Sequence, residues 1–161
     1  MAMRIRDYRD GDGEAVRALI LGIQRGEFGV PVTIDDQPDL LDIPGFYQTG
    51  SGLFHVAEDD GRIVGTIALR DYAPGRVALR KMFVAATHRG SARGVAQALL
   101  DGAIAHCRTL GLRDIHLGTV DVLKAAHRFY EKNGFQRIEK TDLPAEFPLV
   151  AVDTRFYRLP L

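Results

Sequence analysis

The sequence of 161 residues has little of what several classes of protein require. Its single cysteine, Cys107, allows neither an internal disulfide framework nor a multi-cysteine zinc site, and such scarcity is typical of a reducing compartment. No stretch approaches the roughly 18 consecutive apolar residues of a membrane span, and the first residues carry no apolar signal-peptide region. These absences predict a soluble, cytoplasmic protein with no membrane partner.

An excess of charge of either sign is also absent, because 21 lysines and arginines balance 21 aspartates and glutamates. Without a global basic field, nucleic acid is not an expected partner. The five histidines form neither His-x-His nor His-Glu-x-x-His, so no metal site is expected. With 46% apolar residues, no internal repeat and no flexible linker, residues 1–161 predict one domain, as a monomer or a homodimer.

Hydrophobic periodicity predicts an α/β chain of the α+β type, in which three consecutive strands follow a first strand and helix. The Asp59-Asp60-Gly61 step predicts a hairpin between two of these strands. Residues 24–52 contain too many glycines and prolines for a long helix, and they predict a long loop with a short helix near 37–41. The expected strands are 3–7, 53–58, 62–70, 77–84, 115–120, 135–140 and 152–159, and the expected helices are 15–23, 92–110 and 123–133.

A basic, glycine-bearing turn joins the strand that ends at Met82, Phe83 and Val84 to the next helix. Free backbone N–H groups at a helix start and the positive end of the helix dipole favour an anion such as a phosphate, and glycine lets the backbone approach it closely. The spacing alone is equally compatible with a solvated basic turn. The turn and helix start consist of Arg89, Gly90, Ser91, Ala92, Arg93, Gly94, Val95 and Ala96.

This turn and a second motif resemble those of the GNAT superfamily of acyl-CoA-dependent N-acetyltransferases. Residues 89–96 are similar to the family's Gln/Arg-x-x-Gly-x-Gly/Ala. Residues 126–135 (Ala-His-Arg-Phe-Tyr-Glu-Lys-Asn-Gly-Phe) are similar to its Ala-x-x-x-Tyr-Glu-Lys-x-Gly-Phe. The strand order over residues 3–158 matches as well. Two positions depart from the family pattern: Ser91 stands where Gln or Arg is usual, and Leu123 stands where the family often has Asn.

The resemblance implies a single GNAT-like domain whose mixed, mostly antiparallel sheet is flanked by helices and splayed between strands 77–84 and 115–120. It implies that acetyl-CoA is the co-substrate, that residues 82–84 pair with its pantetheine arm and that residues 89–96 hold its pyrophosphate. Ala126 and Phe129 are expected to line the cofactor site as well. Tyr130 occupies the position of the family's general acid, which protonates the departing thiolate.

The expected reaction is direct attack of a primary amine on the thioester. A lysine-like ammonium is about 4.6 kcal/mol from its neutral form at pH 7, so a base or a water relay is required. Many family members carry a glutamate on the strand before the phosphate turn, but residues 79–84 (Leu-Arg-Lys-Met-Phe-Val) contain no carboxylate. Glu27, Glu58 and His116 are candidates for this base, and none is singled out. The candidate substrate-binding residues are Glu27, Phe28 and His116.

Charge is divided along the chain although its total is zero. Residues 26–61 hold eight acids and no lysine or arginine, whereas residues 62–113 hold nine lysines and arginines against two acids. We therefore expect the acidic segment, with Glu27 and Asp39, to select a small cationic amine or a protein or peptide amine. The basic segment is expected to receive the anionic cofactor.

Two other interpretations remain open. A catalytically silent acyl-CoA-binding regulatory module would keep the cofactor site and lack turnover. A serine hydrolase would carry Gly-x-Ser-x-Gly at a strand-to-helix elbow, a spacing that Gly90-Ser91-Ala92-Arg93-Gly94 has. The antiparallel strands that precede this motif do not fit the parallel-sheet order of such hydrolases, which favours Ser91 as a helix N-cap near the phosphate.

Overall fold

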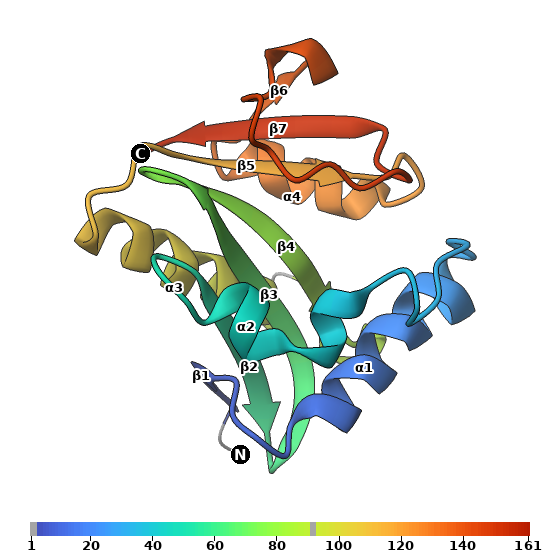
Figure 1. Cartoon of the computed structure of the whole chain (residues 1–161). Coiled ribbons are helices and arrows are strands. Elements are labelled where there is room, and N and C mark those ends of the chain that lie inside the picture. Colours follow the sequence, from blue (N-terminus) through green and yellow to red (C-terminus); the bar gives the residue numbers. More distant parts are fainter. Residues whose placement is uncertain (1–2, 91–92) are drawn as a thin grey trace.

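Seven strands form one open, mixed sheet (Figure 1): β1 (Met3–Asp7), β2 (Leu53–Asp59), β3 (Arg62–Ala73), β4 (Arg76–Val84), β5 (Asp114–Thr119), β6 (Gln136–Ile138) and β7 (Arg155–Pro160). The computed structural model describes residues 3–90 and 93–161. The strands lie in the order β1-β2-β3-β4-β5-β7-β6, and every neighbouring pair is antiparallel except β4 and β5. This topology confirms the expected mixed, mostly antiparallel sheet.

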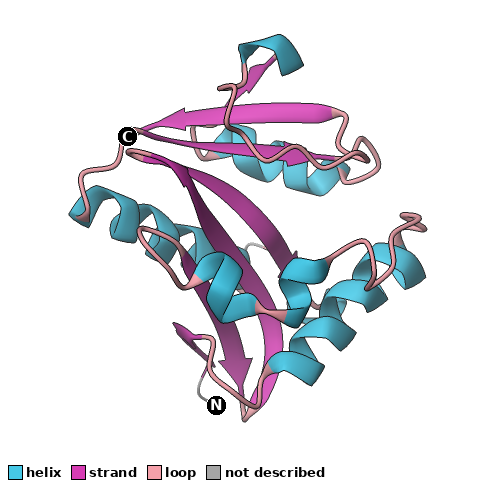
Figure 2. Cartoon of the chain, viewed as in Figure 1, coloured by secondary structure: helices cyan, strands magenta, loops and turns pink. Residues whose placement is uncertain are grey.

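Helices flank the sheet on both sides (Figure 2). The α-helices are α1 (Gly13–Leu21), α2 (Ile43–Tyr47), α3 (Val95–Thr109) and α4 (Lys124–Lys132). A π-helix, η1 (Gly22–Glu27), extends α1, and short 3-10 helices occur at η2 (Pro38–Leu41), η3 (Ala86–His88) and η4 (Lys140–Asp142). Within the described residues no helix combines the length and the apolar character needed to cross a membrane.

The two faces of the sheet bury separate hydrophobic clusters. Successive side chains of a strand point to opposite faces, and on β2 Phe54 and Val56 join one cluster while Leu53 and Ala57 join the other. The first cluster holds α1 and α2 against the sheet, and the second includes residues of α3 and α4. Cys107 is fully buried in the second cluster, as a core residue.

β4 and β5 pair over only three residues each, 76–78 with 114–116. Farther along, β4 stays with β3 and β5 stays with β7, so the two strands separate (Figure 1). A register shift in the β3–β4 ladder accompanies a left-handed φ of +53° at Lys81, whose carbonyl accepts the Thr66 hydroxyl at 2.6 Å. This divergence confirms the expected splay between strands 77–84 and 115–120.

The segment 24–52 contains more helix than expected. Pro38 and Pro44 stand in the first turns of η2 and α2, where the missing proline N–H costs no helical hydrogen bond. Asp42 caps α2, because its side chain accepts the Gly45 N–H at 3.1 Å. Prolines that the sequence pattern presents as helix breakers therefore begin short helices here.

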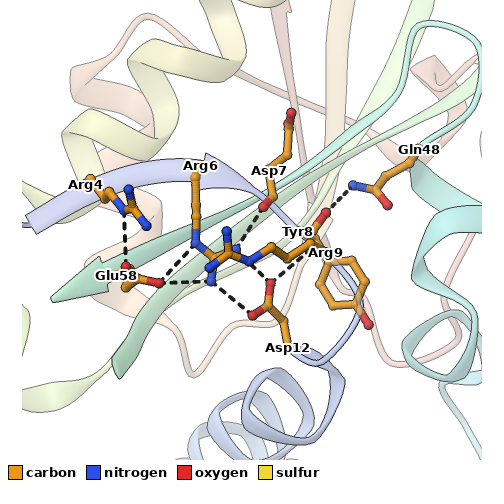
Figure 3. A network of polar contacts seen from close by, with 8 residues as sticks. All are labelled: Arg4, Arg6, Asp7, Tyr8, Arg9, Asp12, Gln48 and Glu58. Carbon is orange, nitrogen blue, oxygen red and sulfur yellow. Dashed lines mark hydrogen bonds and ion pairs between the residues drawn. The ribbon is translucent and has the colours of Figure 1, made fainter. Parts of the chain in front are cut away.

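An ion-pair network ties the start of the chain to the sheet (Figure 3). Arg6 on β1 contacts Asp12 at 2.8 Å and Glu58 on β2 at 3.0 Å, and Arg4 contacts Glu58 at 3.1 Å. Asp12 also accepts the backbone N–H of Arg9 at 2.9 Å, just before α1 begins. The hydrogen bonds from Arg6 lower the pKa of Asp12. Glu58 is thereby held in a structural contact with β1.

Candidate functional site

Two cavities open where β4 and β5 separate. The turn cavity, about 590 Å³ in volume, is lined by the end of β4, the turn that follows it and the starts of α3 and α4. The loop cavity, about 390 Å³ in volume, is lined by β4, the end of β5 and parts of segments 28–37 and 147–153. Phe28, Met82, Phe83 and Leu123 line both cavities. A group bound in one cavity can therefore reach a group bound in the other.

The turn cavity includes the N-terminal end of α3. Gly90 and Gly94 have φ values of +102° and +69°, left-handed conformations that favour glycine, and both line the cavity. Gly94 is the residue before α3 and has no side chain to cap it, so the first N–H groups of α3 carry the positive end of its dipole. Ala96 lines the cavity as well, and so do Lys124 and Lys132, two cations that the motif reasoning missed. Such a site suits a phosphate-bearing ligand.

The other residues expected at this site differ in their placement. Val95 is 2% exposed and belongs to the hydrophobic core, and Arg93 is exposed and lines neither cavity. Ser91 and Ala92 lie outside the described residues. The expected residues that do line the turn cavity, besides the two glycines and Ala96, are Met82, Phe83, Val84, Arg89, Ala126 and Phe129.

Arg89 and Glu27 form a bidentate ion pair between the turn and the end of η1. The Arg89 guanidinium also lies 5.8 Å from the centre of the Phe28 ring, and its Nε donates to the Val84 carbonyl at 2.8 Å. The hydrogen bond from Arg89 lowers the pKa of Glu27, which keeps this carboxylate ionised. Glu27 therefore positions the turn and lines neither cavity, whereas Phe28 lines both.

Tyr130, on α4, lines the loop cavity. The residue is 5% exposed, and its ring packs against Phe129, Phe135 and Tyr157 with centroid separations of 5.9, 5.5 and 6.0 Å. Burial raises the pKa of Tyr130, and the nearby Asp153 carboxylate raises it further. The hydroxyl is therefore protonated at neutral pH. Since it bonds to no other described residue, its proton is available to a ligand.

Asp153 is a second ionisable group of the loop cavity, and the sequence reasoning missed it. The strand expected at 152–159 begins only at Arg155, which leaves Asp153 in the turn before β7. Asp153 lines the loop cavity, and burial raises the pKa of its carboxyl to about 6 against the opposing effect of Arg80 and Lys81. The one feature of the sequence that could have drawn attention to Asp153 is its isolation, because it is the only acid after Glu146.

Most acids of residues 26–61 do not face the loop cavity, and among those described Asp36 is the one that lines it. Asp39 is buried, accepts the Tyr47 hydroxyl at 2.5 Å and lies 3.4 Å from the Lys81 ammonium. Glu58 is bonded to the arginines of β1. The structure therefore does not bring Asp39 or Glu58 to either cavity, and much of this negative charge forms structural pairs.

His116 also lines neither cavity and is 2% exposed. Its Nδ1 lies 3.2 Å from the Tyr72 hydroxyl and 3.5 Å from Asp114, and its ring lies edge-on to Phe147. Burial lowers the pKa of His116, which favours a neutral side chain in this position. Among the residues that the structure describes, no group of three or more His, Cys, Asp or Glu is arranged to hold a metal ion.

The family model and two of the solved structures that match this chain are those of acetyltransferases. The model of the acetyltransferase (GNAT) family matches residues 18–135. An acetyltransferase of the GNAT family from Staphylococcus aureus Mu50 is 38% identical, with a TM-score of 0.95 and 99% of each chain covered. The PaiA N-acetyltransferase of Thermoplasma acidophilum, solved in complex with coenzyme A, shares the fold with a TM-score of 0.78 at 16% identity, with 100% of each chain covered.

A curated relative gives the same assignment over part of its length. The probable N-acetyltransferase family 8 member 5 of Mus musculus is 36% identical over 109 residues, which are 65% of this chain and 47% of the mouse protein. The chain thus matches about half the length of this relative.

Proposed function

The chain belongs to the GNAT acetyltransferase family of acyltransferases, and on this premise we propose that it transfers the acetyl group of acetyl-CoA to a primary amine by direct nucleophilic attack. The observation that carries the proposal is that two cavities share lining residues at the gap between β4 and β5, and that Tyr130 lines one of them. The turn cavity receives acetyl-CoA, and the loop cavity receives the amine.

Acetyl-CoA suits the turn cavity in shape and charge. Beyond the three paired residues, no strand among the described residues pairs with the edge of β4 that faces β5, so backbone groups of residues 82–84 are available to the amides of the pantetheine arm. The N–H groups at the start of α3, together with Lys124 and Lys132, suit its phosphates. An arm that runs along this edge brings the thioester to the gap between the cavities.

The acetyl transfer needs a proton donor for the departing sulfur. The amine nitrogen attacks the thioester carbon, a carbon–nitrogen bond forms and the carbon–sulfur bond then breaks. Tyr130 gives its hydroxyl proton to the departing thiolate, and the nitrogen loses a proton to the phenolate as the amide forms. This sequence regenerates Tyr130 and yields an N-acetyl product and free CoA.

The acceptor is a small primary amine, since the volume of the loop cavity is within the range of small-molecule sites. The charged residues of its lining are the acids Asp36 and Asp153 and the bases Arg80 and Lys81. Cationic amines therefore meet both attraction and repulsion there. Acceptors that carry an acidic group besides the amine complement both signs.

Release of the CoA thiol tests the proposal, measured with acetyl-CoA and a panel of alkylamines, polyamines, amino acids and short peptides. Acceptor-dependent release with at least one primary amine is expected, and its hydroxyl analogue serves as a matched control that gives none. Saturable binding of acetyl-CoA without thiol release for any acceptor would instead support the regulatory module that binds acyl-CoA silently.

A further inference from the structure

We propose that Asp153 is the catalytic base of this reaction and that its carboxylate takes a proton from the ammonium group of the acceptor before the amine attacks. The inference rests on the proposed acetyl transfer. The sequence offered Glu27, Glu58 and His116 as candidates for this base. None of the three lines either cavity, so none is placed to deprotonate the acceptor.

The backbone fixes Asp153 beside the end of β5. The Thr154 N–H donates to the Thr119 carbonyl at 2.9 Å, and the Asp153 N–H donates to the Val150 carbonyl at 3.0 Å. The carboxylate lies so close to Gly118 that a Cβ atom at that position would stand 2.5 Å from Asp153 Oδ2. Glycine at 118 thus leaves room for this carboxylate over β5, on the opposite side of the gap from β4.

The groups that face Asp153 suit a base. Arg80 and Lys81 approach from β4, Tyr130 approaches from α4, and Asp36 is the other carboxylate of the cavity lining. The Lys81 ammonium is already held by Gln37 at 2.5 Å and by a buried aspartate, whereas Asp153 bonds to no other described side chain. Its oxygens therefore remain available to a ligand in the cavity.

The pKa of the Asp153 carboxyl suits a group that accepts a proton near neutral pH. Burial raises the pKa of its carboxyl to about 6, so the group is mostly ionised at pH 7 and still basic enough to hold a proton briefly. Asp36 is less suited, because its Oδ2 accepts the Thr33 N–H at 2.9 Å and the Thr33 hydroxyl at 3.2 Å. Those bonds hold Asp36 in the local turn.

The proton balance of the full reaction closes with both residues. The acceptor enters as an ammonium and gives one proton to Asp153, directly or through one water. The neutral amine then attacks the thioester. Tyr130 gives its proton to the departing thiolate and takes one from the nitrogen as the amide forms. Asp153 then releases its proton to solvent, so one ammonium and one acetyl-CoA become one N-acetyl amine, one CoA thiol and one free proton.

The test compares Asp153→Asn with Asp121→Asn as a matched control. Asp121 follows β5, pairs with Arg155 at 3.6 Å, has a 60% exposed side chain and lines neither cavity. For both variants kcat/KM for the amine is measured by thiol release between pH 6 and pH 10 at saturating acetyl-CoA. The dissociation constant of acetyl-CoA is measured in parallel and reports on the folded state.

Asp153→Asn is expected to lose about 100-fold or more in kcat/KM at pH 7, with acetyl-CoA affinity within about twofold of wild type. The deficit shrinks about tenfold for each pH unit, because the free amine fraction then grows without a base. Asp121→Asn stays near wild type at every pH. A loss below threefold, or one that is constant with pH, overturns the inference, and wild-type inactivity with every amine overturns the proposed function and this role with it.

Discussion

Replacing Asp153 by asparagine is expected to make the folded protein more stable at neutral and alkaline pH, although the proposed role of Asp153 predicts a lower kcat/KM at pH 7. The carboxyl pKa rises from 3.8 to about 6, mainly because burial disfavours the charged form. The folded state therefore holds this proton more tightly than the unfolded chain does. As pH rises through this interval, the wild-type protein loses stability, and an uncharged asparagine has no such loss.

The size of the effect follows from the same shift. A tenfold preference for one protonation state corresponds to about 1.4 kcal/mol, so the shift to about 6 costs the wild-type fold about 3 kcal/mol at pH 8. At pH 5 the native carboxyl is largely protonated, and the same linkage leaves about half of that cost. The advantage of the Asp153→Asn variant is therefore greater at pH 8 than at pH 5 by about 1 kcal/mol.

Urea unfolding of both proteins, followed by circular dichroism at pH 5 and pH 8, measures this difference directly. A residue placed for structure would instead lose stability on substitution. Equal or lower stability of Asp153→Asn at pH 8, or an advantage that is the same at both pH values, would refute the reasoning. Asp121→Asn again serves as the control, since its exposed side chain predicts little change.

Three further substitutions test other parts of the site. Tyr130→Phe is expected to lower kcat about 100-fold or more, with acetyl-CoA affinity within about twofold, because it removes the hydroxyl proposed as the proton donor. Gly118→Ala puts a methyl group 2.5 Å from Asp153 Oδ2 and lowers kcat by about tenfold or more, while an unchanged kcat would contradict that placement. Asp39→Asn leaves the 8% exposed Lys81 side chain without its anion and lowers the free energy of unfolding by about 3 kcal/mol in urea titrations.

Much of the sheet could be predicted, because strands β2, β3 and β4 follow one another along the chain and are joined by tight turns. The hairpin at Asp60 and Gly61 has φ values of +51° and +79°, as the Asp-Gly step predicts. Segment 24–52 could not be predicted in the same way, since its short helices depend on caps such as Asp42 and on tertiary packing. Periodicity carries little information over five residues.

The residues of the candidate site that lie in short motifs could be proposed from the sequence, and those that depend on long-range contacts could not. The turn at residues 89–94 and Tyr130 lie in such motifs, where a helix start or a helix face sets the geometry. Asp153 reaches the cavity only because the turn before β7 binds the end of β5, a contact that no spacing encodes. The charge count along the chain could not show that Glu27 pairs with Arg89, 62 residues away.

The central claim is that the acetyl group passes from acetyl-CoA in the turn cavity to an amine in the loop cavity. The ratio of N-acetyl product to released CoA, measured with an active amine, tests this claim most directly. Thiol release and mass spectrometry of the acceptor are followed together for wild type and Tyr130→Phe. One N-acetyl product per CoA released is expected, with both signals lost together in the variant. CoA release without acetylation of the amine nitrogen, or a variant as fast as wild type, would contradict transfer at this site.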